Sequence, residues 1–135
     1  MYTKDFTVEI VTPVRTKFEG TCQEIILPGI QGEMAVLGGH APLLTMLSPG
    51  ITVTKQGDKE QVLTTGEGFA TIAENRVVCL VDFAHEISEL DFDALRAERD
   101  GLQSELNADP GNAHIRNKKQ QVEAKLRAEN YGKNS

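Results

Sequence analysis

One short stretch of the sequence, Asp93-Ala94-Leu95-Arg96-Ala97, places an acid and a base three residues apart. In a helix, residues at this spacing lie on the same face, so the two charged side chains would be neighbours. In one reading, the arginine binds a phosphate group and the carboxylate binds a ribose or an amino group. In the other, which the residues favour, the two side chains form an ordinary ion pair within the helix.

The other reactive side chains form no recognisable catalytic or metal-binding pattern. Cys22 and Cys79 are far apart among apolar neighbours, which favours buried free thiols over a disulfide or redox pair. The three histidines are scattered, without the spacing of metal ligands. His40 lies in a Gly-Gly-His-Ala-Pro turn and Glu33 lies in a loop. No nucleophile elbow or phosphate-binding loop is present, so we expect a protein that is not an enzyme and requires no cofactor.

Composition narrows the class of protein further. The 135 residues include 14 Lys and Arg against 20 Asp and Glu, which gives a formal net charge of -6. This balance argues against a nucleic-acid-binding protein, because phosphate binding needs a basic surface. No apolar run approaches the ~20 residues that span a bilayer, and the N-terminus lacks an apolar signal core. We expect one or two small domains in the cytosol, or held at a membrane through partners without insertion.

Short strands dominate the first 85 residues, with turns of glycine, proline and asparagine between them. The predicted strands cover residues 6–11, 14–18, 22–27, 34–37, 51–54, 60–65, 69–73 and 76–83. This regular spacing indicates an antiparallel β-sandwich or flattened barrel. In the last strand, Val77, Cys79 and Val81 share one face and Val78 and Leu80 the other. This strand is therefore expected to be central and buried on both sides.

The pattern changes after the last strand, where apolar residues recur near helical spacing. Ser88 is predicted to cap a first helix, which ends at an Asn-Ala-Asp-Pro-Gly-Asn break, and a second helix covers 113–130. Because the connection is short, the helices should form an antiparallel hairpin. We therefore divide the chain into a β-sandwich domain, residues 1–85, and a helical hairpin, residues 86–135.

The two helices differ in charge, since the first is mostly acidic and the second mostly basic. The basic residues of interest in the second helix are Arg116, Lys118, Lys119, Lys125 and Arg127. In one reading, the opposite charges attract each other within the hairpin, each exposed pair contributing ~0–1 kcal/mol. In the other, the basic helix detaches and binds an acidic partner. The apolar stripes are thin, which makes the hairpin marginally stable by itself, as a conformational switch requires.

The stretch 27–50 contains five of the twelve glycines and three of the five prolines. It reads Leu-Pro-Gly, then Gly-Glu-Met, then Gly-His-Ala-Pro-Leu-Leu-Thr, then Pro-Gly. In this order and spacing the stretch resembles the epsilon subunit of the F-type ATP synthase, called delta in mitochondria. The resemblance covers most of residues 5–85 and, more weakly, the rest. Ala35 and Gly38 depart from the family pattern, in which glycine and proline are usual at these positions.

The resemblance implies a non-catalytic subunit of the rotating central stalk, which couples proton flow to ATP synthesis. The implied partners are the gamma subunit, the ring of membrane c subunits and the alpha/beta catalytic hexamer. The loop with Glu33 and His40 would contact the ring, and the basic second helix would contact acidic segments of the catalytic subunits. With the resemblance added, the switch is favoured: the hairpin permits ATP hydrolysis when folded against the sandwich and restrains it when extended.

Two further expectations come from the resemblance. Some members of the family bind ATP weakly through an Asp-x-x-Arg-Ala motif, which makes Asp93 and Arg96 candidates for binding a regulatory ATP. The implied location is the cytoplasmic face of the bacterial inner membrane or, alternatively, the stromal face of the thylakoid.

A rival hypothesis from another class is a small ligand-binding β-sandwich with a dimerising helical tail. An antiparallel helical hairpin can self-associate as readily as it can bind a host complex, and sedimentation of the isolated chain distinguishes the two. An enzyme comes third, because no convergent set of acid, base and nucleophile can be named.

Overall fold

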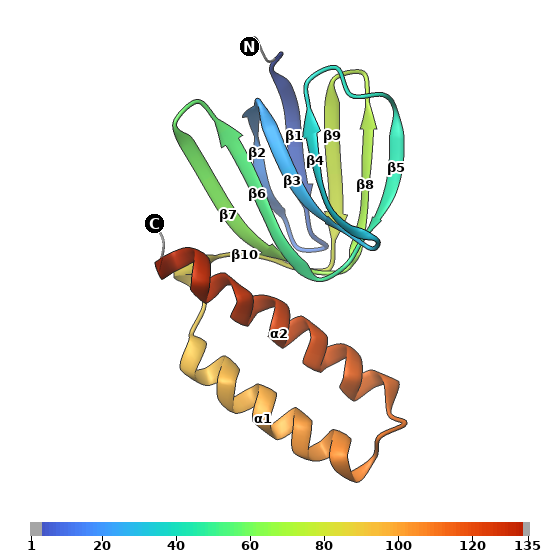
Figure 1. The fold of residues 1–135 in the computed structure, drawn as a ribbon, viewed down its shortest axis with the longest axis vertical. Helices are drawn as coiled ribbons and strands as arrows, with labels where there is room; N and C mark the ends of the chain where they lie inside the picture. The colour runs from blue at the N-terminus through green and yellow to red at the C-terminus, as the bar shows by residue number, and fades with distance from the viewer. Residues whose placement is uncertain (1–3, 134–135) are drawn as a thin grey trace.

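The structure of the protein, a computed structural model, describes residues 4–133. Ten strands form one twisted sheet that folds over into a nearly closed sandwich, and two helices follow it (Figure 1). The strands are β1 (Phe6–Val11), β2 (Thr16–Cys22), β3 (Glu24–Gly29), β4 (Gly32–Leu37), β5 (Leu43–Leu47), β6 (Gly50–Gln56), β7 (Lys59–Thr65), β8 (Gly68–Ala73), β9 (Arg76–Val81) and β10 (Ala84–Glu86). A 3-10 helix, η1 (Ile87–Glu89), leads to the helices α1 (Phe92–Ala108) and α2 (Ala113–Lys133). The predicted fold class is confirmed.

The strands follow the order β10-β7-β6-β3-β5-β8-β9-β1-β2, with β4 paired to β3. The pairs are antiparallel except for β1 and β9, which run parallel. Alternate residues of each strand point into the sandwich and form one apolar core. Its largest fully buried side chains include Ile10, Ile25, Leu27, Leu47 and Leu63.

The prediction for β9 was right about its place and wrong about its second face. The strand is central, between β8 and β1, and Val77, Cys79 and Val81 point into the core. Val78 is half-buried and Leu80 is exposed, however, because no second layer formed by residues 4–133 covers the outer face of this part of the sheet. The apolar residues on that face, Val78 and Leu80, are therefore not part of the core.

Both cysteines are buried free thiols, as predicted. Burial raises the pKa of the Cys79 thiol to about 12. Burial, assisted by the negative charge of Asp5, raises that of Cys22 to about 11. The thiolate is the reactive form of cysteine, so both side chains act here as small apolar groups.

Several element boundaries differ from those predicted. Strands β5 and β10 were not expected, and β2 starts at Thr16 instead of residue 14 because the Thr12 hydroxyl accepts hydrogen bonds from the amides of Val14 and Arg15 and holds a turn there. The prediction that Ser88 caps the first helix is wrong. Ser88 lies within η1, and the side chain of Asp91 caps α1 by accepting from the Ala94 amide at 3.1 Å.

Helix α2 lies between α1 and the sandwich (Figure 1) and contacts β6 and β7. On the side that faces α1, Val122 packs with Leu95 and Leu102 of α1. Ala124 and Ala128 lie on the opposite side of α2 and are fully buried. Their small side chains let the helix approach the sheet closely, so the hairpin is folded against the sandwich.

Candidate functional site

An exposed apolar patch covers the outer face of the sheet on β5, β8 and β9. Its members are Leu44, Met46, Phe69 and Leu80, whose exposed fractions are 65%, 52%, 37% and 40%. Met46 lies opposite Phe69, and Phe69 lies opposite Leu80, so their side chains form a continuous row across three strands. We call these four residues the outer apolar patch.

A groove and an ion pair lie on the same face as the patch. A groove of about 350 Å³ runs beside Phe69 and Leu80 and is also lined by Val11, Thr12 and Pro13. Further along the same outer face, Glu9 and Arg76 form an ion pair between β1 and β9. An apolar centre with a polar, charged rim is the usual composition of a protein–protein interface.

The structure places Glu33 and His40 apart, not in one loop. Glu33 lies within β4, opposite Pro28 of β3, and is exposed. His40 lies beyond the other end of β4, also exposed, with its Nδ1 2.6 Å from the Ala41 carbonyl oxygen. From Glu33 to Leu37 the strand alone spans about 13 Å, at ~3.3 Å per residue. Any single partner that contacts both must extend along this strand.

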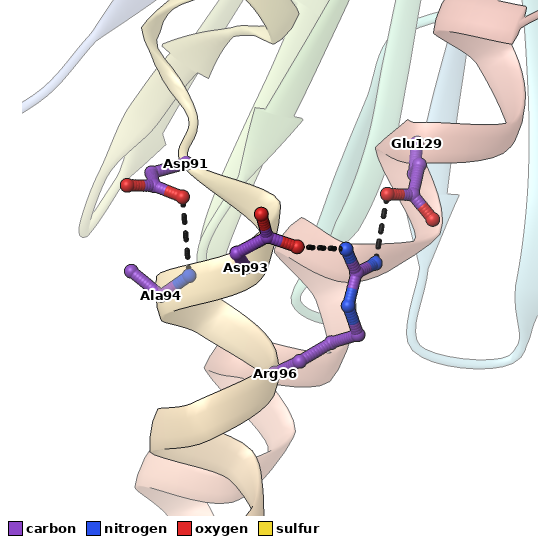
Figure 2. Close-up of polar contacts among 5 residues, drawn as sticks. All are labelled: Asp91, Asp93, Ala94, Arg96 and Glu129. Atoms are coloured by element: carbon purple, nitrogen blue, oxygen red, sulfur yellow. Dashed lines mark hydrogen bonds and ion pairs between the residues drawn. The ribbon is translucent and has the colours of Figure 1, made fainter.

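Asp93 and Arg96 lie at the start of α1 and contact each other, as their spacing predicted (Figure 2). The Arg96 guanidinium donates one hydrogen bond to Asp93 at 2.5 Å and another to Glu129 of α2 at 2.8 Å. The hydrogen bond to Glu129, which has the larger effect, and the hydrogen bond to Asp93 raise the pKa of Arg96. No local pattern indicated Glu129, because it is 33 residues away from Arg96 in the sequence and approaches only when the hairpin closes.

The Asp93 and Glu129 carboxylates that contact Arg96 bear on both interpretations of this motif, the phosphate site and the ion pair. They form an ion-pair bridge between α1 and α2, with the arginine on the acidic helix and the carboxylate on the basic one. The positive partner therefore lies on the mostly acidic helix and the negative partner on the mostly basic one, the reverse of what the overall charges of the helices suggest. A phosphate group that binds the Arg96 guanidinium on the side facing α2 would have to displace the Glu129 carboxylate. ATP binding at this motif stays a prediction.

The basic residues of α2 separate into two groups. Lys125 and Arg127 face the sandwich: the Lys125 ammonium lies 4.5 Å from the centre of the Phe83 ring, and Arg127 donates to the Pro49 carbonyl at 3.0 Å. Both contacts hold α2 against the sheet. The group nearer the start of α2, away from these contacts, consists of Arg116, Lys118 and Lys119.

The junction between the sandwich and the hairpin carries further contacts, which involve Lys17, Glu89 and His85. The Lys17 ammonium on β2 lies 2.5 Å from a carboxylate oxygen of Glu89 in η1. That contact, with a hydrogen bond from the Glu86 amide, lowers the pKa of Glu89. The ring of His85 on β10 stacks on Phe83, with 5.5 Å between ring centres.

Residues 4–133 include no group of three or more His, Cys, Asp and Glu side chains that could hold a metal ion. Neither of their two long helices combines the length and the apolar character needed to cross a lipid bilayer.

Comparison with known proteins adds an independent finding. Residues 5–87 match the family model described as the ATP synthase delta/epsilon chain, beta-sandwich domain. An ATP synthase epsilon chain of Bradyrhizobium sp. is 38% identical over 108 residues, which cover 79% of each chain. One of Microcystis aeruginosa is 37% identical over 102 residues, which cover 75% of this chain and 73% of the relative.

Solved structures agree with this assignment at the level of the fold. A chain of the mitochondrial ATP synthase of Euglena gracilis, solved with OSCP, F1 and the c-ring, superposes with a TM-score of 0.73 at 20% identity and covers 90% of this chain and 75% of that one. A chain of the Tetrahymena thermophila central stalk and c-ring gives 0.61 at 14% identity, with 95% and 98% covered. The match to the family model and the identity to its members show that this chain belongs to the ATP synthase delta/epsilon family.

Proposed function

We propose that the chain is the epsilon subunit of an ATP synthase, a non-catalytic component of the central stalk, and that its outer apolar patch binds the gamma subunit. The observation that carries this proposal is the row of Met46, Phe69 and Leu80 on a sheet face that no other part of residues 4–133 covers. Burying apolar side chains against a partner is favourable by ~25 cal/mol per Å² of area removed from water. The two superposed structures are of ATP synthase assemblies that include a c-ring, and the second is of the central stalk and c-ring, which supports the same placement.

The other partners follow from the remaining surfaces. Glu33 and His40, both exposed and separated by the length of β4, are proposed contacts to the ring of c subunits. Arg116, Lys118 and Lys119 are the proposed contacts of an extended hairpin to acidic segments of the catalytic hexamer. In this arrangement the complex lies on the cytoplasmic face of a bacterial inner membrane, and the subunit couples proton flow to ATP synthesis without entering the membrane.

Regulation is assigned to the helical hairpin. Among residues 4–133, the contacts that hold its folded position include two buried alanines, the contacts of Lys125 and Arg127 and the Lys17–Glu89 ion pair, which a conformational change can break. We propose that the folded hairpin permits ATP hydrolysis and that the extended hairpin restrains it. ATP at Asp93 and Arg96 would replace Glu129 as the partner of the arginine and act as a regulatory ligand.

The rival hypothesis of a dimerising helical tail has less support. The large apolar residues of α1 and α2 pack within the hairpin, and Tyr131 is the large apolar residue of the described helices that stays exposed. A hairpin with so little free apolar surface offers a weak dimer interface.

Binding to gamma tests the proposal directly. L80E should weaken binding of the chain to its gamma subunit at least tenfold, because it buries a charge within the outer apolar patch. L37E is the matched control, since Leu37 is exposed to a similar degree, 47%, but lies on β4. Equal binding by L80E and the unmodified chain would exclude the patch as the interface.

Hydrolysis tests the regulatory part. A catalytic complex that lacks its own epsilon subunit is assayed with the full chain and with a version that ends after residue 87. Slower hydrolysis with the full chain alone assigns the restraint to the hairpin. Equal rates with both versions, although both bind gamma, would leave a coupling subunit without a regulatory hairpin.

A further inference from the structure

His85 occupies a position that changes when the hairpin moves. It lies on β10 opposite Thr64 of β7, and cross-strand partners point to the same face of a sheet. Leu63 belongs to the core, so Thr64 and His85 point outward, toward the side of β7 that α2 contacts. Thr64 is nevertheless fully buried, and its hydroxyl has no hydrogen-bond partner. His85 therefore sits at the margin of the docked hairpin.

Positive charge surrounds this histidine. Lys125 of α2 lies over Phe83, the ring that stacks on His85, so docking brings an ammonium group close enough for its charge to act on the imidazole. Lys17 of β2 and Arg15 of the preceding turn add further positive charge. Glu89 of η1 is the nearby carboxylate, and it already pairs with Lys17 at 2.5 Å.

We propose that His85 is a pH-sensitive element of the sandwich–hairpin junction, whose protonation favours release of the hairpin. In the docked state, a charged imidazole would lie beside Lys125, Lys17 and Arg15 in a partly dehydrated site. In the released state, Lys125 has moved away and water reaches the ring. This pH response is a property of the isolated chain and does not depend on the proposed function.

The direction of the effect follows from linkage. Burial, and then the charge of Lys125, lower the pKa of His85 in the docked state, while Glu89 opposes them. The docked state therefore binds fewer protons than the released state, and docking weakens as pH falls through the ordinary titration range of histidine, near ~6.5. Lowering the pH from 8 to 5.5 should reduce the docking equilibrium constant by up to about tenfold.

Energy transfer between two dyes on the isolated full chain measures docking. Cysteines introduced at the exposed positions Ser104 and Asp58 report the distance from the hairpin to the sandwich, while the native thiols, Cys22 and Cys79, are buried and react slowly. We expect a fall in docking at low pH that disappears in H85Q. The matched control H114Q removes an exposed histidine of α2 and should leave the pH response unchanged.

A second measurement does not depend on how far the hairpin opens. Proton NMR titration of the imidazoles should show a higher pKa for His85 in K125Q than in the unmodified chain. K118Q, which removes an exposed lysine elsewhere on α2, should leave it unchanged. A pKa of His85 that does not respond to K125Q, or a pH response of docking that survives H85Q, overturns the proposal.

Discussion

Ala128 tests whether the hairpin is held by close packing on the sandwich. Its side chain is fully buried on the side of α2 opposite α1. In A128L, three additional carbon atoms must enter this contact, and overpacking of this kind typically costs ~1–3 kcal/mol. The strain is relieved most easily by moving the hairpin away, since α1 and α2 keep their own contacts when they move together. The docking equilibrium constant should therefore fall roughly 5- to 150-fold, because ~1.4 kcal/mol is a factor of ten.

Amide hydrogen exchange provides the assay. Amides of β6 and β7 that exchange only when α2 leaves should exchange faster in A128L by the same factor, while amides of β1 and β9 should keep their rates. The matched control is A97L, which adds the same atoms to an exposed position of α1. Unchanged exchange at β6 and β7 in A128L, or an equal increase in A97L, would refute the argument that the alanine contact holds the hairpin.

Three further predictions concern other parts of the molecule. The pKa of Glu89 is lowered in the docked chain, so its pairing with Lys17 stabilises docking at pH values above the ordinary pKa of a glutamate, near ~4.3. This stabilisation is lost as the pH falls below that value. The acid titration of docking should therefore change in E89Q. Cys22 and Cys79, with pKa values of about 11 and about 12, should resist iodoacetamide at pH 8 until the chain is unfolded, as mass spectrometry of the modified protein can show. Asn75 adopts a left-handed backbone, accepts from the Gly39 amide and donates to the Asp5 carbonyl, so N75A should lower the free energy of unfolding in urea by ~1–3 kcal/mol, whereas an unchanged midpoint would contradict this role.

Where local patterns carried the information, the sequence was sufficient. Alternation of apolar and polar residues located most of the strands, and the short Asn-Ala-Asp-Pro-Gly-Asn break fixed an antiparallel helical hairpin. The three-residue spacing of Asp93 and Arg96 predicted their contact, because a helix fixes that geometry by itself. The apolar surroundings of Cys22 and Cys79 predicted buried thiols. The order of glycine and proline turns in the stretch 27–50 was enough to indicate the family.

The tertiary structure decided everything that depends on contacts between distant segments. β5 was missed because Leu-Leu-Thr-Met-Leu does not alternate: Leu44 and Met46 point outward as apolar residues, which a pattern of buried and exposed positions does not predict. Leu80 was expected to be buried for the same reason. Only the order of the strands shows that these side chains meet on one uncovered face.

The contacts of the hairpin have the same origin. Glu129 reaches Arg96 and Lys125 reaches Phe83 across more than thirty residues of sequence, and no local pattern specifies such pairs. The two buried alanines of α2, Ala124 and Ala128, resemble ordinary helix-forming residues until the sheet is placed against them. The sequence by itself therefore determined most of the elements and indicated the family. The packing of α2 on the sheet decided which residues hold the hairpin, because burial and charge pairing are properties of the folded chain.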